Sequence, residues 1–345
     1  MSLPLGVTLG DPAGVGAEVI LKALAHARLR RVPVVVVGDV ETLRETAKRL
    51  RLGCELIPLS EADVVAGALP PRLCPRSTDR PTVPVVATSR LGASARRPGK
   101  PSIAGGRAAY RYIEAAARLA QAKAIAGIVT APINKAWVTR AGFPISGHTE
   151  LLKDLTGARD VRMMLAGSRL RVVLVTMHLA LAKVPPALNV RDIARTIVMA
   201  AAHLRRYHRL AEPRIAVAGL NPHAGEDGLF GREEERVIAP AIERARRAGV
   251  SASGPYPADS LFFQAVHGKF DAVIAMYHDQ GLIPLKLLHF HDAVNVTLGL
   301  PIIRTSPDHG TAYDIAGQGK ADAGSMIAAI ALAHTMGRAK SLSPP

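Results

Sequence analysis

The sequence predicts an α/β fold of two domains, in which helices cover sheets of mainly parallel strands. The chain has 345 residues, enough for two domains of ordinary size with separate cores. Apolar β-branched segments alternate with segments of helical periodicity, as expected of βαβ units. Hydrophobic residues make up 48% and aromatic residues only 4%, so small aliphatic side chains must fill the core. This composition favours packed α/β layers over an aromatic-rich sandwich.

Five apolar segments predict strands. Residues 32–39, "VPVVVVGD", form a continuous apolar run bounded by proline and Gly-Asp, which is typical of a strand buried on both faces of a parallel sheet. The same form recurs at residues 124–132, 170–178, 214–223 and 271–278.

Two helices and a loop-rich segment lie between them. Residues 101–123 carry one polar and one apolar stripe at helical spacing. Residues 231–249 have acids in the first turn, arginines in the last and Gly249 at the end, which predicts a second helix. Residues 58–101 are rich in proline and predict a loop-rich excursion with short edge strands.

The charge balance is strongly basic, with 44 Lys and Arg against 28 Asp and Glu, a formal charge of +16. The charges are scattered and no aromatic residues interleave with them, so we expect solvated helix faces and no nucleic-acid partner. The start of the chain lacks a signal peptide pattern and no apolar run is long enough to span a membrane. With Cys54 and Cys74 at no metal or redox spacing, a cytoplasmic chain with reduced thiols is predicted.

Three predicted strands are each followed by a histidine: His178, His223 and His278. Ligands bind beyond the carboxyl ends of parallel strands, and three imidazoles with an open position form a catalytic metal site. Each histidine taken alone is more often structural. Their shared position makes them candidates for one metal site.

Other polar residues are candidates for binding or structure. In "SGHTE", Thr149 is expected to cap a helix beside His148, and helix starts bind anions. Asp259 in "YPADSLFF" is expected at a helix N-cap. Lys286 and Arg304 can together hold a phosphate or carboxylate.

Two glycine-rich stretches differ in what they indicate. "GDPAGVGAE", residues 10–18, lacks the dinucleotide fingerprint and the P-loop lysine, so it is either a weak phosphate loop or a tight turn. "SPDHGTAYDIAGQG", residues 306–319, resembles the adenine-binding loop of isocitrate and isopropylmalate dehydrogenases, which hold NAD(P) without that fingerprint. On this resemblance the cofactor contacts are Gly310, Thr311, Ala312 and Asp314.

These stretches, together with "TAPINKA", "GHTELL", "GLNPHAGE", "PADSLFF" and "MYHDQGLIPLK", resemble the 4-hydroxythreonine-4-phosphate dehydrogenase family of pyridoxine biosynthesis from about residue 5 to 335. The resemblance implies a homodimer with an isocitrate-dehydrogenase-like αβα fold and an active site at the subunit interface. It implies a dinucleotide-binding domain of residues 1–130 plus 295–345. Residues 131–294 would carry the metal ligands and the dimer interface.

The resemblance also assigns roles to residues. The metal ligands would be His178, His223 and His278, contributed by both subunits. The small phosphorylated substrate would be bound by His148, Thr149, Lys286, Asn295 and Arg304. Asp259, or a bound water, would be the general base, and Lys286 would orient the substrate.

The reaction that the resemblance implies is oxidation of 4-phosphohydroxy-L-threonine at C3 by NAD or NADP, followed by decarboxylation. A divalent ion such as Zn²⁺, Mg²⁺ or Co²⁺ would assist it. Ala17, Ser146 and the segment after His178 depart from the family pattern, so a dehydrogenase of D-threonate or D-erythronate 4-phosphate is an alternative. A metal-dependent hydrolase is an alternative of another class, because it would use the same histidines. The sequence leaves the native metal, the choice of NAD or NADP, and the general base open.

Overall fold

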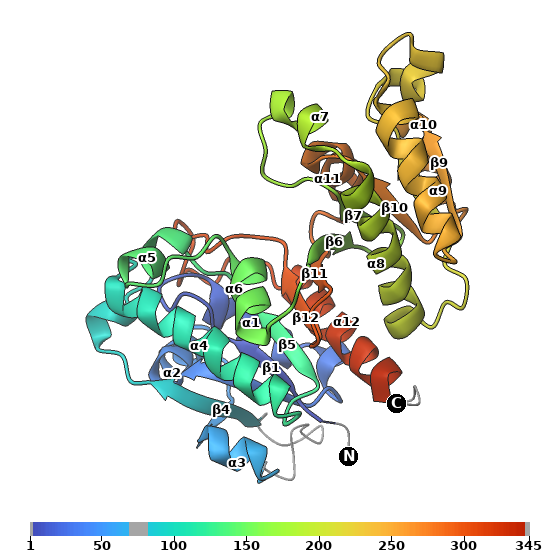
Figure 1. Ribbon diagram of the computed structural model, residues 1–345. Coiled ribbons are helices and arrows are strands. Elements are labelled where there is room, and N and C mark those ends of the chain that lie inside the picture. The colour runs from blue at the N-terminus through green and yellow to red at the C-terminus, as the bar shows by residue number, and fades with distance from the viewer. Residues whose placement is uncertain (1–2, 69–81, 342–345) are drawn as a thin grey trace. The chain divides into compact units, whose positions relative to one another are not determined.

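The computed structural model describes residues 3–68 and 82–341. Its contacts divide the chain into two compact units, which Figure 1 shows. Unit 1 is Met1–Arg159 with Leu300–Arg338, and unit 2 is Asp160–Gly299 with Ala339–Pro345. Each unit is a sheet with helices packed on it, so the predicted α/β class is confirmed. Cys54 is a half-buried free thiol, and Cys74 lies outside the described residues.

The sheet of unit 1 is parallel, in the order β3-β4-β2-β1-β5-β12. Its strands are β1 Leu5–Thr8, β2 Val34–Asp39, β3 Glu55–Leu59, β4 Thr82–Ser89, β5 Gly127–Thr130 and β12 Arg304–Pro307. Every residue of β2 is buried, as its unbroken apolar run predicts for a strand covered on both faces.

Helix α4 (Ile103–Gln121) lies along the sheet of unit 1 and contacts four of its strands (Figure 1). The Ser102 side chain accepts a hydrogen bond from the Gly105 N–H and starts the helix. Small residues and two fully buried ones, Tyr112 and Ile113, form its packed face. The other helices are α1 Gly16–Ala25, α2 Val40–Arg49, α3 Glu61–Val65, α5 Lys135–Arg140, α6 His148–Thr156 and α12 Gly324–Ser341, with 3-10 turns at Ala27–Leu29 and Ala93–Arg96.

The sheet of unit 2 is mixed, in the order β11-β6-β7-β10-β8-β9. Its strands are β6 Arg162–Ala166, β7 Arg171–Leu174, β8 Ile215–Ala218, β9 Ala252–Tyr256, β10 Ala272–Ala275 and β11 Val294–Leu298. The run β7-β10-β8-β9 is parallel, whereas β6 is antiparallel to both β7 and β11. The sequence analysis missed the β6–β7 hairpin, because strand β6 has no flanking proline or histidine signal.

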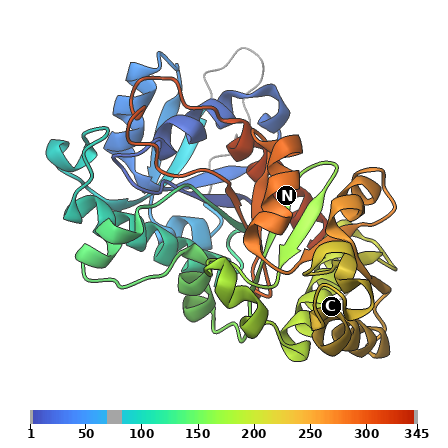
Figure 2. The same cartoon turned by 90° about the horizontal axis from the view of Figure 1, so that it is seen from above.

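Helix α11 (His278–His289) packs on β7 and β10, and it is drawn in orange in Figure 2. A core of Leu165, Val172, Leu174, Val273 and Leu285 joins the helix to the sheet. The other helical segments are α7 Val184–Ala187, α8 Val190–His208, α9 Ala239–Arg247 and α10 Ala258–Val266. There are also 3-10 turns at Leu181–Lys183 and Pro222–Gly228, and a π-helical turn at Glu234–Ile238. None of the described helices has the length and apolar character that a membrane crossing needs.

Strand β4 differs from the prediction for residues 58–101. It lies inside the sheet between β3 and β2, not at an edge, although it contains Pro84. The side chains of Val83, Val85 and Val86 are buried. The stabilisation from burying them exceeds the cost of the one sheet hydrogen bond that Pro84, which has no N–H, cannot donate. This explains why β4 lies inside the sheet. Residues 69–81 of this segment lie outside the described residues.

The unit boundaries fall at Arg159/Asp160 and Gly299/Leu300, whereas the sequence analysis placed domain boundaries at 130/131 and 294/295. Residues 131–159, which the prediction assigned to the second domain, belong to unit 1 and contain α5 and α6. Both helices pack against α4, so their contacts lie in unit 1. The predicted helix over residues 231–249 is present as a π-helical turn that continues into α9.

Candidate functional site

The three predicted histidines follow three neighbouring strands of unit 2. His178 follows β7, His278 follows β10 and His223 follows β8, and β10 lies between the other two strands with all three parallel. Their carboxyl ends therefore share one edge of the sheet. The rings of His178 and His278 lie 5.9 Å apart, centroid to centroid.

The two rings line a pocket of about 420 Å³ within unit 2. The other lining residues are Met177, Leu179, Leu181, Val184, Tyr277 and Asp279. His278 Nδ1 lies 2.7 Å from Oδ1 of Asp279. A neutral ring that donates from Nδ1 keeps its lone pair on Nε2, and this carboxylate–histidine pairing is common among metal ligands. Asp279 is therefore in contact with an imidazole.

His223 is placed by an unusual turn. Six successive residues, 223–228, have positive φ angles, and four of them are not glycine. The ring of His223 lies 6.0 Å from that of Phe230, centroid to centroid. The buried carboxylate of Glu234 accepts hydrogen bonds from the N–H groups of Leu220 at 2.7 Å and Asn221 at 2.8 Å, and it holds the start of this turn.

The structure thus brings two of the three predicted metal ligands together. In residues 3–68 and 82–341 of a single chain, no three His, Cys, Asp or Glu side chains are grouped to hold a metal ion. The paired histidines and Asp279 nevertheless fit a divalent metal, because imidazole nitrogen with a carboxylate behind it is its preferred donor. They supply part of a coordination shell.

The other candidates of unit 2 lie on α10, α11 and β11. Asp259 is exposed at the second position of α10; the N-cap is Pro257, so the predicted capping role is wrong. Its Oδ1 accepts a hydrogen bond from the Ser260 N–H at 2.8 Å. Lys286 is half-buried on α11, with Nζ 6.0 Å from the Phe290 ring centroid. Asn295 is half-buried on β11, opposite Leu165.

In unit 1, Arg304 is a buried cation. It begins β12 and is 3% exposed. Its Nη2 donates to Oγ1 of Thr130, at the end of β5, over 2.9 Å. Burial lowers the pKa of the guanidinium to about 10, and the Glu150 carboxylate opposes that shift. The arginine therefore stays charged at neutral pH.

His148 lies near two cations, Arg304 and Lys135, and these three residues with Thr130 are called the cationic neighbourhood of unit 1. Burial lowers the pKa of its imidazole well below the usual range, and the cations of Arg304 and Lys135 lower it further. Its Nε2 atom is buried and makes no hydrogen bond among the described residues. Thr149 is buried in the first turn of α6, and Gly147 is the N-cap, so the predicted cap by Thr149 is wrong.

Sequence reasoning missed two residues of this neighbourhood, Thr130 and Lys135. The signal was present, because both lie within "TAPINKA", residues 130–136, which overlaps the end of the strand predicted at residues 124–132. The structure places Thr130 at the end of β5 and Lys135 at the start of α5.

The predicted cofactor loop lies in unit 1 between β12 and α12. At Gly310 no atom lies within 4 Å of the position that a Cβ would occupy, so the backbone there is open to a ligand. Ala312 has a φ of 43°, Asp314 is exposed, and the Thr311 carbonyl accepts a hydrogen bond from the Val15 N–H at 3.0 Å.

Comparison with known proteins identifies the family. The model of the family described as "Pyridoxal phosphate biosynthetic protein PdxA" matches residues 30–333. The chain belongs to the PdxA family. It is 48% identical over 330 residues to a 4-hydroxythreonine-4-phosphate dehydrogenase of Desulforapulum autotrophicum, covering 95% of this chain and 94% of the relative. This PdxA-family chain is therefore an oxidoreductase, a dehydrogenase.

Two further proteins resemble this chain over almost its whole length. A D-threonate 4-phosphate dehydrogenase of Pectobacterium atrosepticum is 44% identical, covering 96% of this chain and 99% of the relative. The crystal structure of a 4-hydroxythreonine-4-phosphate dehydrogenase from Klebsiella pneumoniae matches with a TM-score of 0.86 at 44% identity. It covers 97% of this chain and all of that one. The PdxA-family chain thus has similar relatives that are named for two different substrates.

Proposed function

We propose that this PdxA-family dehydrogenase oxidises the C3 hydroxyl of 4-phosphohydroxy-L-threonine with NAD⁺ or NADP⁺, and that the β-keto acid product loses CO₂. The observation that carries the proposal is the paired rings of His178 and His278, 5.9 Å apart beyond two neighbouring parallel strands. Family membership favours this reading over a metal-dependent hydrolase, which would use similar histidines.

The paired histidines would hold a divalent metal ion, with Asp279 fixing the ring of His278. When bound, such an ion supplies Lewis-acid polarisation of the hydroxyl that is oxidised. His223 would complete the ligand set from the partner subunit, because within one chain it is not grouped with the other two. A ligand set of three imidazole nitrogens accepts several metals, among them Zn²⁺ and Co²⁺.

A second copy of the chain would cover part of unit 2. On α11, Ile283, Leu287 and Phe290 are 60%, 82% and 72% exposed. Their spacing of four and then three residues places them on one face of the helix that begins with His278. An exposed apolar face beside an incomplete ligand set supports a homodimer. Light scattering of the purified protein tests this oligomeric state.

The substrate phosphate would be bound by the cationic neighbourhood of unit 1. Arg304 offers a planar fork that suits phosphate oxygens, and its bond to Thr130 fixes the fork's orientation. His148 has a buried Nε2 atom that makes no hydrogen bond within the part of the chain that the structure describes. With its pKa lowered, the ring is neutral at pH 7 and donates to, or accepts from, a substrate oxygen without adding charge. Thr149 would add a hydroxyl donor.

In unit 2, we assign Lys286 to orientation of the substrate and Asn295 to a hydrogen bond with it. Asp259 is our candidate for the general base. Its exposure suits a group that exchanges protons with water, and it lies in the first turn of α10 with Oδ1 bonded to the Ser260 N–H. The nicotinamide dinucleotide would lie on Gly310, Thr311, Ala312 and Asp314, where the open space at Gly310 allows close approach.

The substrate test compares three compounds: phosphohydroxythreonine, D-threonate 4-phosphate and D-erythronate 4-phosphate. Each is incubated with NAD⁺ or NADP⁺ and a divalent metal, and reduced nicotinamide is followed by its near-ultraviolet absorbance. The proposal predicts the highest kcat/KM for phosphohydroxythreonine. A higher value for D-threonate 4-phosphate would favour the activity for which the Pectobacterium relative is named.

A further inference from the structure

The motif "GDPAGVGAE", residues 10–18, was open to two readings, a phosphate loop or a tight turn. Its backbone N–H groups decide between them. Those of Asp11, Ala13, Gly14 and Val15 all donate to protein acceptors at 2.9–3.0 Å, and Pro12 has none. A phosphate cradle needs N–H groups that point at the ligand. Residues 11–15 therefore do not form such a cradle, and their contacts indicate another task.

That task involves the predicted cofactor loop, which the motif contacts at several points. The Val15 N–H donates to the Thr311 carbonyl at 3.0 Å. The Tyr313 hydroxyl donates to Oδ2 of Asp11 at 2.7 Å. A Cβ at Gly14 would stand 2.9 Å from the Thr311 carbonyl oxygen, so only glycine allows this approach.

The far end of the loop is held by the end of the motif. Glu18 is 2% exposed and accepts hydrogen bonds from the N–H groups of Ala321 at 2.9 Å and Gly319 at 3.3 Å. Lys22, one turn along α1, pairs with Glu18 at 2.8 Å and donates to the carbonyls of Gly319 and Ala321. Two side chains of α1 thus bond both the N–H groups and the carbonyl oxygens of Gly319 and Ala321.

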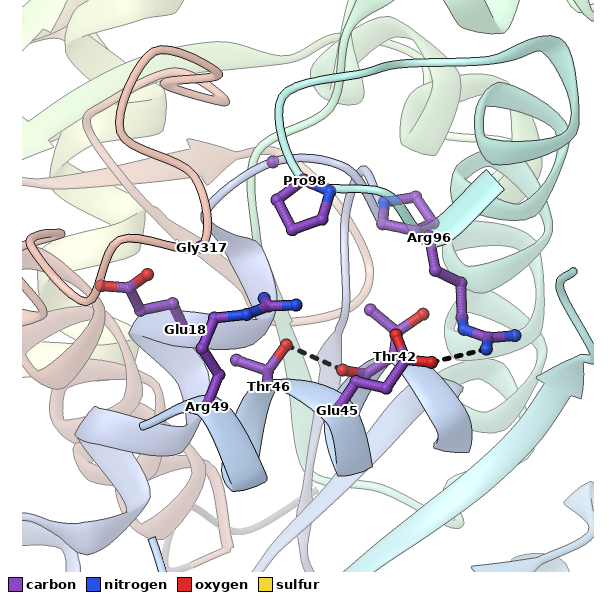
Figure 3. Close-up of a pocket in the computed structure, with 10 residues that line it drawn as sticks. Glu18, Thr42, Glu45, Thr46, Arg49, Arg96, Pro98 and Gly317 are labelled. Carbon is purple, nitrogen blue, oxygen red and sulfur yellow. Dashed lines mark hydrogen bonds and ion pairs between the residues drawn. The ribbon is translucent and has the colours of Figure 1, made fainter. Parts of the chain in front are cut away.

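The space beneath the loop is closely packed. Figure 3 shows Gly317 near Pro98 and Arg49, with Glu18 beside them. The cavity that these residues line is about 10 Å³, which holds no more than one water molecule. A Cβ on Gly317 would lie 2.9 Å from the Pro98 ring. The loop is therefore backed by protein on this side and open at Gly310.

We propose that "GDPAGVGAE" is a positioning motif for the nicotinamide dinucleotide: Asp11 and Glu18 hold the loop of residues 310–321 in its binding conformation. The inference rests on the proposed role of that loop. Burial raises the pKa of the Tyr313 phenol, and the Asp11 carboxylate raises it further, so the phenol keeps its proton and donates to Asp11.

The test uses Tyr313→Phe, which removes one hydroxyl from the loop. The matched control is Tyr110→Phe, at a half-buried tyrosine that stacks on Phe143. Calorimetry measures Kd for NAD⁺ and NADP⁺, and hydrogen exchange measures amide protection over residues 310–321. Loss of a hydrogen bond to a carboxylate should raise the dinucleotide Kd about tenfold. The loop amides should exchange faster, the KM for the phosphorylated substrate should stay unchanged, and the control should behave as wild type.

Unchanged Kd and unchanged loop exchange in Tyr313→Phe would overturn the inference while leaving the proposed function intact. If the wild-type protein binds neither dinucleotide, the proposed function fails first and the inference fails with it. Should Tyr313→Phe not fold, Glu18→Gln provides the second variant, because the amide keeps one acceptor for Ala321 and weakens the pair with Lys22. It should raise the same Kd and speed exchange at Gly319 and Ala321, and wild-type values for both would again overturn the inference.

Discussion

His278 and Asp279 are adjacent in sequence and bonded through their side chains, with Nδ1 and Oδ1 2.7 Å apart. Both lie in the first turn of α11, immediately beyond β10. The carboxylate therefore selects the ring nitrogen that remains available on His278. Across the pocket, the ring of His178 lies 5.9 Å away.

Asp279→Asn should weaken metal binding about 10- to 100-fold, the usual effect of removing a carboxylate behind a ligating histidine. Competition with a chromophoric chelator measures the zinc Kd in the wild type and the variant. Asp154→Asn, at an exposed acid of α6 outside the predicted site, is the control. Equal zinc affinity in Asp279→Asn and the wild type would show that Asp279 does not support a metal ligand.

Arg304→Lys should raise the KM for the phosphorylated substrate about 10- to 100-fold, because lysine keeps the charge but loses the fork. Steady-state kinetics at saturating dinucleotide measure the change. Thr130→Val is a companion variant that removes the acceptor of Arg304 and should give a smaller rise in KM. A KM that stays at the wild-type value in Arg304→Lys would move the phosphate site elsewhere.

Glu234→Ala should lower the free energy of unfolding by about 2 kcal/mol or more, since it leaves the N–H groups of Leu220 and Asn221 without their acceptor. The turn that carries His223 would also loosen. Urea unfolding measures stability, and Glu235→Ala, at an exposed neighbouring glutamate, serves as the control. Equal stability of the two variants would contradict the role given to Glu234.

Acid should destabilise the fold through His203 and His208 on α8. Burial lowers the pKa of His203 to about 3, with the charges of His208 and Arg171 adding to the effect, and burial lowers that of His208 to about 4. Both folded-state pKa values lie below the usual value near 6.5. Between the folded pKa and pH 6.5, the unfolded chain therefore binds more protons at these histidines than the folded chain does. Stability is therefore full above about pH 6.5 and falls as the pH drops toward the folded pKa values.

For His203 alone the loss between pH 7 and pH 5 is about 2 kcal/mol. His203→Phe keeps the ring contact with Tyr207 and cannot take up a proton, so its stability should fall less steeply over this range. Urea unfolding at several pH values compares it with the exposed-site control His267→Gln. Parallel pH profiles for His203→Phe and the wild type would contradict the assignment.

The sequence predicted five of the twelve described strands, β2, β5, β7, β8 and β10, because their signals are local. Apolar runs such as residues 32–39 and the histidines that follow three strands need no tertiary information to be recognised. The caps were harder to predict: Thr149 and Asp259 have suitable side chains, but the N-cap of each helix lies two residues earlier, at Gly147 and Pro257. Local hydrogen-bonding capacity does not fix where a helix starts when packing sets the entry.

Contacts between distant segments were beyond the sequence. Nothing in "GDPAGVGAE" indicates that Asp11 meets Tyr313, 302 residues later. The buried pairing of Arg304 with Thr130 joins two strands that are 174 residues apart. Such contacts follow from strand order in the sheet, which the pattern of strands and helices leaves undetermined.

The most direct test of the central claim is the rate of dinucleotide reduction by chelator-treated enzyme given phosphohydroxythreonine, before and after Zn²⁺ or Co²⁺ is restored. We predict no reduced nicotinamide before the metal is added, recovery afterwards, and little recovery in His178→Ala or His278→Ala. Full activity without metal, or no activity with any of the three substrates under any condition, would contradict it.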